Sequence, residues 1–202
     1  EFIPWATPNF WGKEKKYINS SLNSNWISGG EYLEKFENQI KLFLNAKYVH
    51  AVSNGTTALH AALLSLNIKK NDEIILPGFG YMAAANLTIQ FGAIPKFSDV
   101  NPDTWCQSAT TIENCITKKT KAIVVIHNYG NMCDMKPIIE LGNYYKIPVI
   151  EDSAESFGSK YNNKASGTIG DIGTFSFHAT KLITTGEGGA IICKSRQMSD
   201  QI

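Results

Sequence analysis

The sequence has little charge, and what it has is balanced. Only 18% of its 202 residues are Asp, Glu, Lys or Arg, below the roughly 25% of an average soluble domain. Its 19 basic and 18 acidic residues leave a net charge of +1. There is no basic excess to neutralise phosphates, which argues against nucleic acid as the main partner. The low charge fraction indicates instead that another subunit covers part of the surface.

Long apolar runs and paired cysteines are also missing. Apolar runs reach only five residues, as at 122–126, whereas a membrane span needs about 18. No signal peptide is visible, so neither membrane insertion nor secretion is expected. The four cysteines, Cys106, Cys115, Cys133 and Cys193, include no C-x-x-C pair. They predict free thiols in a reducing, cytoplasmic setting, and no metal site is expected.

What the chain does contain divides at about residue 30. Residues 1–30 are rich in Asn, Ser and aromatic residues and have little periodicity. They predict an irregular N-terminal arm that lies across the main domain or a partner subunit. Residues 31–202 are expected to form one large domain.

Within this domain, short apolar β-branched runs alternate with amphipathic segments. The predicted strands are residues 48–52, 73–76, 94–97, 122–127, 148–151, 173–177 and 189–193. The predicted helices are residues 31–44, 56–66, 81–91 and 137–145. This alternation predicts βαβ units in an α/β fold, with a mostly parallel seven-stranded sheet between helical layers. In such sheets ligands bind beyond the carboxyl ends of the strands.

Two of these strand ends lead into small or aromatic residues. Residues 53–58, S-N-G-T-T-A, open a helix whose N–H groups favour an anion, although an ordinary cap by Ser53 or Asn54 explains them equally well. The stretch is neither a P-loop nor a G-x-G-x-x-G fingerprint, which disfavours an ATP- or NAD-binding domain. Tyr81, after the second strand, could stack on a planar ring or belong to the core.

Two further strand ends lead into charged residues. Asp152 follows the fifth strand, where a buried carboxylate needs a cationic partner or a hydrogen-bond donor. A salt bridge or a helix cap would explain it equally simply. Lys181 follows the sixth strand and is either an amine nucleophile or a surface lysine. A phosphate cradle, a stacking ring, a carboxylate and a lysine together meet the needs of pyridoxal 5'-phosphate (PLP).

In six stretches of sequence the chain resembles the DegT-type nucleotide-sugar aminotransferases. These are PLP enzymes of the aspartate-aminotransferase fold (fold type I). The matching stretches are S-N-G-T-T-A-L-H (53–60), D-E-I-I-L-P-G-F-G-Y (72–81), T-K-A-I-V-V-I-H-N-Y-G (120–130), I-E-D-S-A-E-S-F-G-S (150–159), G-D-I-G-T-F-S-F-H-A-T-K (170–181) and T-T-G-E-G-G (184–189). The resemblance implies a three-layer αβα large domain. It also implies that these residues belong to a longer protein, whose small C-terminal domain is missing from this chain.

The resemblance assigns roles residue by residue. Lys181 becomes the Schiff-base lysine that shuttles protons, and Asp152 the partner of the pyridine nitrogen. Tyr81 becomes the aromatic that stacks on the ring. Glu155 stands where many relatives have Gln contacting the ring hydroxyl. The residues expected to bind the PLP phosphate are small or carry a hydroxyl group: Gly55, Thr56, Thr57 and Ser176. His127 and His178 are expected only to line the pocket or to support it.

Lys181 also bears on the reaction, because a dehydratase branch of this family has His at that position. Its presence favours transamination, with glutamate as the expected donor. The pattern is most similar to the branch that aminates C4 of nucleotide-linked 4-keto-6-deoxyhexoses. Within it we expect a dTDP-viosamine synthase-like enzyme, with a GDP-perosamine synthase-like or 3-keto-sugar enzyme as the alternative. The alternative of a different class is a non-catalytic PLP-fold regulatory protein. Such a protein should lack Lys181 or Asp152, and this chain has both. A homodimer with shared active sites is implied.

Overall fold

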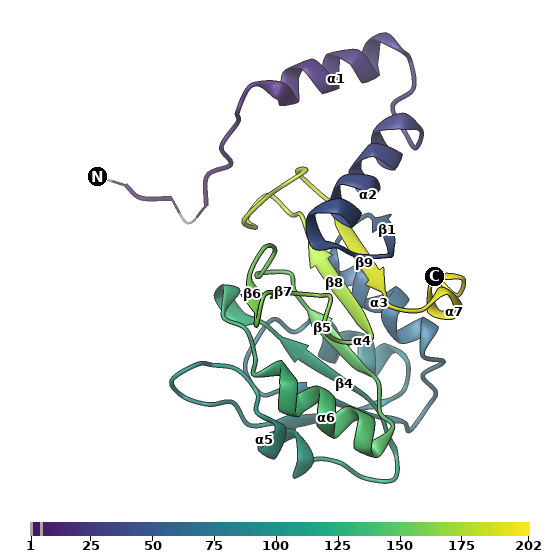
Figure 1. Ribbon diagram of the computed structural model, residues 1–202, viewed down its shortest axis with the longest axis vertical. Helices are drawn as coiled ribbons and strands as arrows, with labels where there is room; N and C mark the ends of the chain where they lie inside the picture. Colours follow the sequence, from purple (N-terminus) through teal and green to yellow (C-terminus); the bar gives the residue numbers. More distant parts are fainter. Residues whose placement is uncertain (1, 5) are drawn as a thin grey trace.

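A seven-stranded sheet forms the centre of the computed structural model, which describes residues 2–4 and 6–202 (Figure 1). In spatial order its strands are β1 (Tyr48–Val52), β9 (Gly189–Cys193), β8 (Ile172–Ser176), β5 (Val149–Asp152), β4 (Thr120–Ile126), β2 (Glu73–Pro77) and β3 (Ile94–Ser98). Strand β9 is antiparallel to β1 and β8, while the pairings among β8, β5, β4, β2 and β3 are parallel. The predicted mostly parallel sheet is confirmed.

Helices cover both faces of this sheet and complete the three layers. They are α2 (Glu31–Leu44), α3 (Gly55–Ser65), α4 (Ala83–Gln90), α5 (Ala109–Glu113), α6 (Met135–Tyr145) and α7 (Arg196–Ser199). In β4, Ala122 and Val124 join the core under α3 and α4, while Ile123 and Val125 join the core under α5 and α6. Because successive side chains of a strand point to opposite faces, a strand covered on both faces must be apolar throughout.

Helix α2 is held against the sheet by a third apolar cluster. Ile40 and Leu44 of α2 pack with Phe175 and Phe177, which lie in β8 and just beyond it. The Phe36 and Phe177 rings meet edge to face, with centroids 5.3 Å apart. This packing fixes the carboxyl end of β8, from which the Lys181 segment continues.

The expectation of a wholly irregular arm was wrong, because residues Lys13–Asn23 form helix α1. Its first turn is stabilised by Glu14, whose carboxylate accepts hydrogen bonds from the N–H groups of Trp11 at 3.0 Å and Gly12 at 2.7 Å. No residue of α1 is buried, and the helix stands away from the sheet in Figure 1. Its contact with α2 includes the edge-to-face pair Tyr17–Tyr32.

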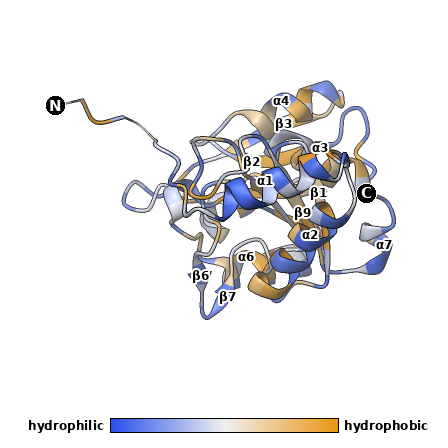
Figure 2. Cartoon of the chain, turned by 90° about the horizontal axis from the view of Figure 1, so that it is seen from above, coloured by the Kyte–Doolittle hydropathy of each residue, from blue (hydrophilic) through white to orange (hydrophobic). Residues whose placement is uncertain are grey.

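Several short elements were also not predicted: α5, the 3-10 turn η1 (Asn128–Gly130) and the hairpin β6 (Lys160–Tyr161)–β7 (Lys164–Ala165). The hairpin turn has positive φ at Asn162 and Asn163, which Asn tolerates better than most residues. The hairpin tip is hydrophilic in Figure 2. In the described part of the chain, no helix combines the length and apolar character that crossing a membrane requires.

Candidate functional site

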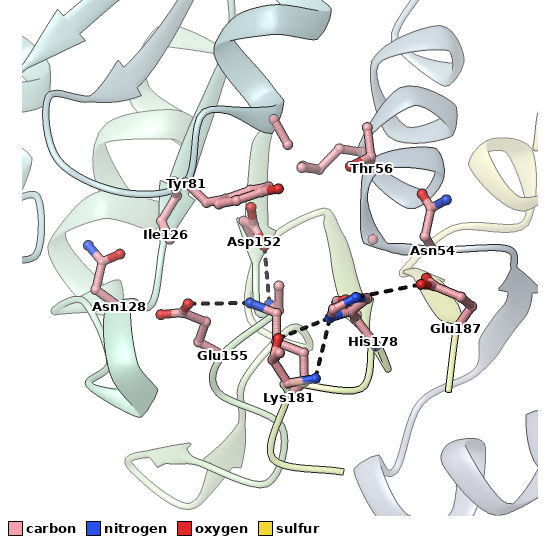
Figure 3. Close-up of a pocket in the computed structure, with 16 residues that line it drawn as sticks. Asn54, Thr56, Tyr81, Ile126, Asn128, Asp152, Glu155, His178, Lys181 and Glu187 are labelled. Atoms are coloured by element: carbon pink, nitrogen blue, oxygen red, sulfur yellow. Dashed lines mark hydrogen bonds and ion pairs between the residues drawn. The ribbon is translucent and has the colours of Figure 1, made fainter. Parts of the chain in front are cut away.

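The carboxyl ends of β2, β4, β5 and β8 and the N-terminus of α3 enclose a pocket of about 320 Å³ (Figure 3). A parallel sheet gathers residues that are far apart in sequence at one edge, which is why strand-end residues meet here. Seven of the eight residues predicted for the site line this pocket: Gly55, Thr56, Tyr81, Asp152, Glu155, Ser176 and Lys181.

Asp152 is the last residue of β5 and lies between its register partners Ile126 of β4 and Thr174 of β8. It is only 4% exposed. Its Oδ1 accepts a hydrogen bond from the Ala154 N–H at 3.1 Å. Burial raises the pKa of the Asp152 carboxyl to about 6, against the opposing effects of that N–H and of the Lys181 charge. Such a carboxylate is stabilised by a cationic donor in the pocket.

The N-terminus of α3 supplies the anion-binding side of the pocket. Asn54 is the N-cap, and its Oδ1 accepts from the Thr57 N–H at 2.8 Å and the Thr57 hydroxyl at 3.0 Å. Thr57 is not among the residues that line the pocket, and its role in phosphate binding stays a prediction. A Cβ on Gly55 would lie 2.8 Å from the Cβ of Ser176. Only glycine lets the helix end approach Ser176 this closely, leaving the backbone of Gly55 and Thr56 at its first turn.

Lys181 reaches the pocket between an acidic and an aromatic side chain. Its Nζ lies 3.3 Å from Oε1 of Glu155 and 5.8 Å from the centroid of the Tyr81 ring. The other oxygen of Glu155 accepts the Tyr129 N–H at 2.9 Å, so each oxygen of this carboxylate has a partner. Tyr81 is 73% exposed and is therefore not a core aromatic.

The two histidines have different surroundings. His178 lines the pocket, with Nε2 3.5 Å from Oε1 of Glu187. His127 is buried behind the site, and its Nε2 lies 2.9 Å from Oε2 of Glu151. The Glu151 carboxylate also accepts the N–H groups of Gly167 at 3.1 Å and Ile169 at 2.6 Å. This cluster ties the loop before β8 to β5 and so fixes the strand that carries Asp152.

Sequence reasoning missed Asn128 and Glu187 as residues of the pocket lining and considered Asn54 only as a cap. Asn128 lies two residues beyond the end of β4, so the strand-end rule applied to that strand would have found it. Glu187 belongs to the glycine-rich T-T-G-E-G-G turn, whose path back past the pocket depends on pairing with residues 177–178.

The donor set of this pocket fits PLP. The described residues contain no group of three or more His, Cys, Asp or Glu side chains placed to hold a metal ion. If PLP were bound here, the buried carboxylate of Asp152 would suit its pyridine nitrogen, the exposed ring of Tyr81 could stack on it, and Lys181 could supply the amine for its aldehyde. The helix N-terminus beside Ser176 suits a phosphate.

This sheet and this pocket have the architecture of fold type I PLP-dependent enzymes. The chain belongs to the DegT/DnrJ/EryC1/StrS aminotransferase family, whose sequence profile matches residues 10–202.

The relatives agree with that assignment. The chain is 48% identical over 202 residues to a GDP-perosamine synthase of Escherichia coli O157:H7, a match that covers all of this chain and 56% of the relative. An aminotransferase structure from Psychrobacter cryohalolentis superposes with a TM-score of 0.93 at 36% identity, covering all of this chain and 51% of that one. An E. coli GDP-4-keto-6-deoxy-D-mannose-3-dehydratase with bound hydrated PLP superposes with a TM-score of 0.93 at 31% identity, covering 98% and 52%. The chain thus spans about half the length of these relatives.

Proposed function

We propose that the protein carrying this chain is a PLP-dependent aminotransferase that transfers an amino group to a nucleotide-linked keto sugar. The observation that carries the proposal is the presence of Lys181 and Asp152 in one pocket, beside the N-terminus of α3. A non-catalytic PLP-fold regulatory protein should lack one of these two residues. A dehydratase of the family should have His in place of Lys181.

The side chains of the pocket have distinct tasks in this proposal. PLP, when bound, supplies an electron sink conjugated to the reacting carbon. Asp152 keeps a proton on the pyridine nitrogen, and burial strengthens that interaction because little water competes for the carboxylate. Lys181 provides the amine that attaches the cofactor and carries protons to and from the substrate carbon. Glu155 positions Nζ of Lys181 from 3.3 Å away.

The sugar we propose is a GDP-linked 4-keto-6-deoxyhexose, aminated at C4. The 48% identity to a GDP-perosamine synthase over the whole chain supports this alternative better than the dTDP-viosamine synthase-like expectation. Glutamate is the proposed amino donor. A 3-keto sugar is the competing substrate, and a panel of nucleotide-linked 3-keto and 4-keto sugars distinguishes the two.

We further propose a homodimer with shared active sites, in which residues 1–30 form an arm on the partner subunit and residues 31–202 form the cofactor-binding domain. Exposed aromatic side chains support this arrangement. Phe10, Trp11 and Trp26 of the arm contribute nothing to the buried core, and rings of this size favour a covering surface.

The direct test of the proposed function is the covalent attachment of the cofactor. The full-length protein, supplied with PLP, should show a visible absorption band that borohydride removes, and mass spectrometry should then find a pyridoxyl group on Lys181. Lys181→Ala should abolish the band, while Lys160→Ala, which replaces an exposed lysine of β6, should leave it unchanged. A folded, PLP-supplemented protein without the band would contradict the proposal.

A further inference from the structure

Three aromatic side chains form a cluster beside the pocket: Phe79, Trp105 and Tyr129, called the rim aromatics below. The ring centroids of Phe79 and Trp105 lie 5.8 Å apart, and those of Trp105 and Tyr129 lie 5.6 Å apart. The three residues follow β2, β3 and β4, so the same sheet edge that carries the pocket brings them together. They are 42%, 51% and 62% exposed, respectively, and so present ring surface to solvent.

The backbone holds two of these rings in an uncommon conformation. Trp105 has φ of 56° and Tyr129 has φ of 53°, in the left-handed region that bulky residues rarely adopt. Asn101 stabilises the first, because its carbonyl accepts the Trp105 N–H at 2.7 Å. Backbone strain of this kind persists only where the surrounding contacts impose it, and it is concentrated at binding sites.

Asn128 connects the rim aromatics to the pocket. Its side chain lines the pocket, and its Nδ2 donates to the carbonyl oxygens of Trp105 at 2.8 Å and Phe79 at 3.4 Å. The next residue, Tyr129, donates its N–H to Glu155, the ion-pair partner of Lys181. The rings are thus fixed relative to Lys181 by a continuous series of contacts.

The pocket is small for a nucleotide-linked sugar that binds beside a cofactor. At about 320 Å³ it is near the lower end of ligand pockets, which range from about 300 to 1,000 Å³, and its polar groups already match PLP. In the proposed function, the nucleotide part of a sugar substrate would therefore lie outside this pocket, beyond the residues that line it. In Figure 3 Glu187 lies on the opposite side of the pocket from Asn128, and its carboxylate would repel a diphosphate on that side.

From this arrangement we infer that the rim aromatics are the stacking surface for the base of the nucleotide-sugar substrate. The inference rests on the proposed function and adds to it the place where the nucleotide is recognised. Planar bases stack on exposed aromatic rings, and rings whose backbone is already fixed lose little freedom on binding.

GDP itself is the probe, titrated calorimetrically into the PLP-loaded full-length protein. Trp105→Leu should weaken GDP binding by about tenfold, the order expected for the loss of one base–aromatic stack. Trp105→Phe, which keeps a ring, should bind GDP to within about threefold of the unchanged protein. Tyr144→Leu is the matched control, because it removes an exposed ring that also packs against an aromatic neighbour, but on α6.

The outcomes separate this inference from the proposed function. Unchanged GDP affinity in a folded Trp105→Leu protein that still aminates the sugar overturns the stacking surface and leaves the proposed function intact. Loss of the dimer in sedimentation, with unchanged GDP affinity, also overturns it and assigns the cluster to a subunit contact. GDP affinity that depends on Trp105 in a protein without amino transfer supports the stacking surface and overturns the proposed function.

Discussion

Replacing Asp152 with Asn should stabilise the cofactor-free protein at neutral pH. Burial raises the pKa of this carboxyl to about 6, from an ordinary value of 3.8. Between these two values the unfolded chain releases the proton while the folded protein retains it, so rising pH favours unfolding. At about 1.36 kcal/mol per pH unit, the difference corresponds to about 3 kcal/mol of destabilisation. This penalty develops between about pH 4 and 6 and is complete above pH 6.

Urea denaturation of the cofactor-free full-length protein measures this effect. At pH 7 the free energy of unfolding of Asp152→Asn should exceed that of the unchanged protein by up to about 3 kcal/mol, and below about pH 4 the two should agree. The Asn side-chain oxygen can still accept the Ala154 N–H, so that hydrogen bond is kept. Asp103→Asn is the control, since that side chain is exposed, and it should show little change at either pH.

Bound PLP should reduce or reverse the stability advantage of Asp152→Asn over the unchanged protein. If Asp152 pairs with the pyridine nitrogen as proposed, the unchanged protein should gain stability from that interaction, whereas Asn would offer only a neutral partner. PLP should therefore raise the stability of the unchanged protein more than that of the variant. An Asp152→Asn protein that is less stable at pH 7 without cofactor, or a difference that does not vary with pH, would refute the reasoning.

Three further outcomes are expected. Gly55→Ala should weaken PLP binding by at least about tenfold in a spectroscopic titration. The new Cβ would lie 2.8 Å from the Cβ of Ser176 and would push the end of α3 away from it. Unchanged affinity would show that the helix end does not contact the phosphate. Glu151→Ala should lower the free energy of unfolding by about 3–5 kcal/mol. The reason is that the His127 ring and the N–H groups of Gly167 and Ile169 would lose their buried acceptor. A loss below about 1 kcal/mol would mean that water replaces the carboxylate. Alkylation of the native protein should begin at partly exposed Cys115 and spare buried Cys106, although the neighbouring buried thiol of Cys133 lowers the pKa of Cys106 below its ordinary value. Peptide mapping that finds Cys106 labelled first would show that this region opens readily.

The residues that sequence reasoning located best are those at the ends of central strands. Asp152 lies at the pocket because a parallel sheet brings the carboxyl ends of its strands to one edge. Lys181 follows β8 by a few residues and reaches the same edge. The strands themselves were predictable because a run such as 122–126 is apolar at every position, which only a sheet covered on both faces requires.

Other features depend on details that the sequence left open. Thr57 follows Thr56 directly, but its N–H and hydroxyl both bond to the Asn54 side chain, and Thr57 is not among the residues that line the pocket. The pairing of Glu155 depends on the N–H of Tyr129, a residue of the 3-10 turn far away in sequence. Helix α1 was missed because its start depends on the Glu14 side chain returning to the two preceding N–H groups.

The central claim is that Lys181 and Asp152 serve amino transfer to a GDP-linked keto sugar. The most direct measurement is product formation by the full-length protein with PLP, glutamate and GDP-4-keto-6-deoxymannose, followed by mass spectrometry. We predict a GDP-linked amino sugar, formed by the unchanged protein and by Lys160→Ala but not by Lys181→Ala. A 3-deoxy product, or amino transfer that persists in Lys181→Ala, would contradict the account.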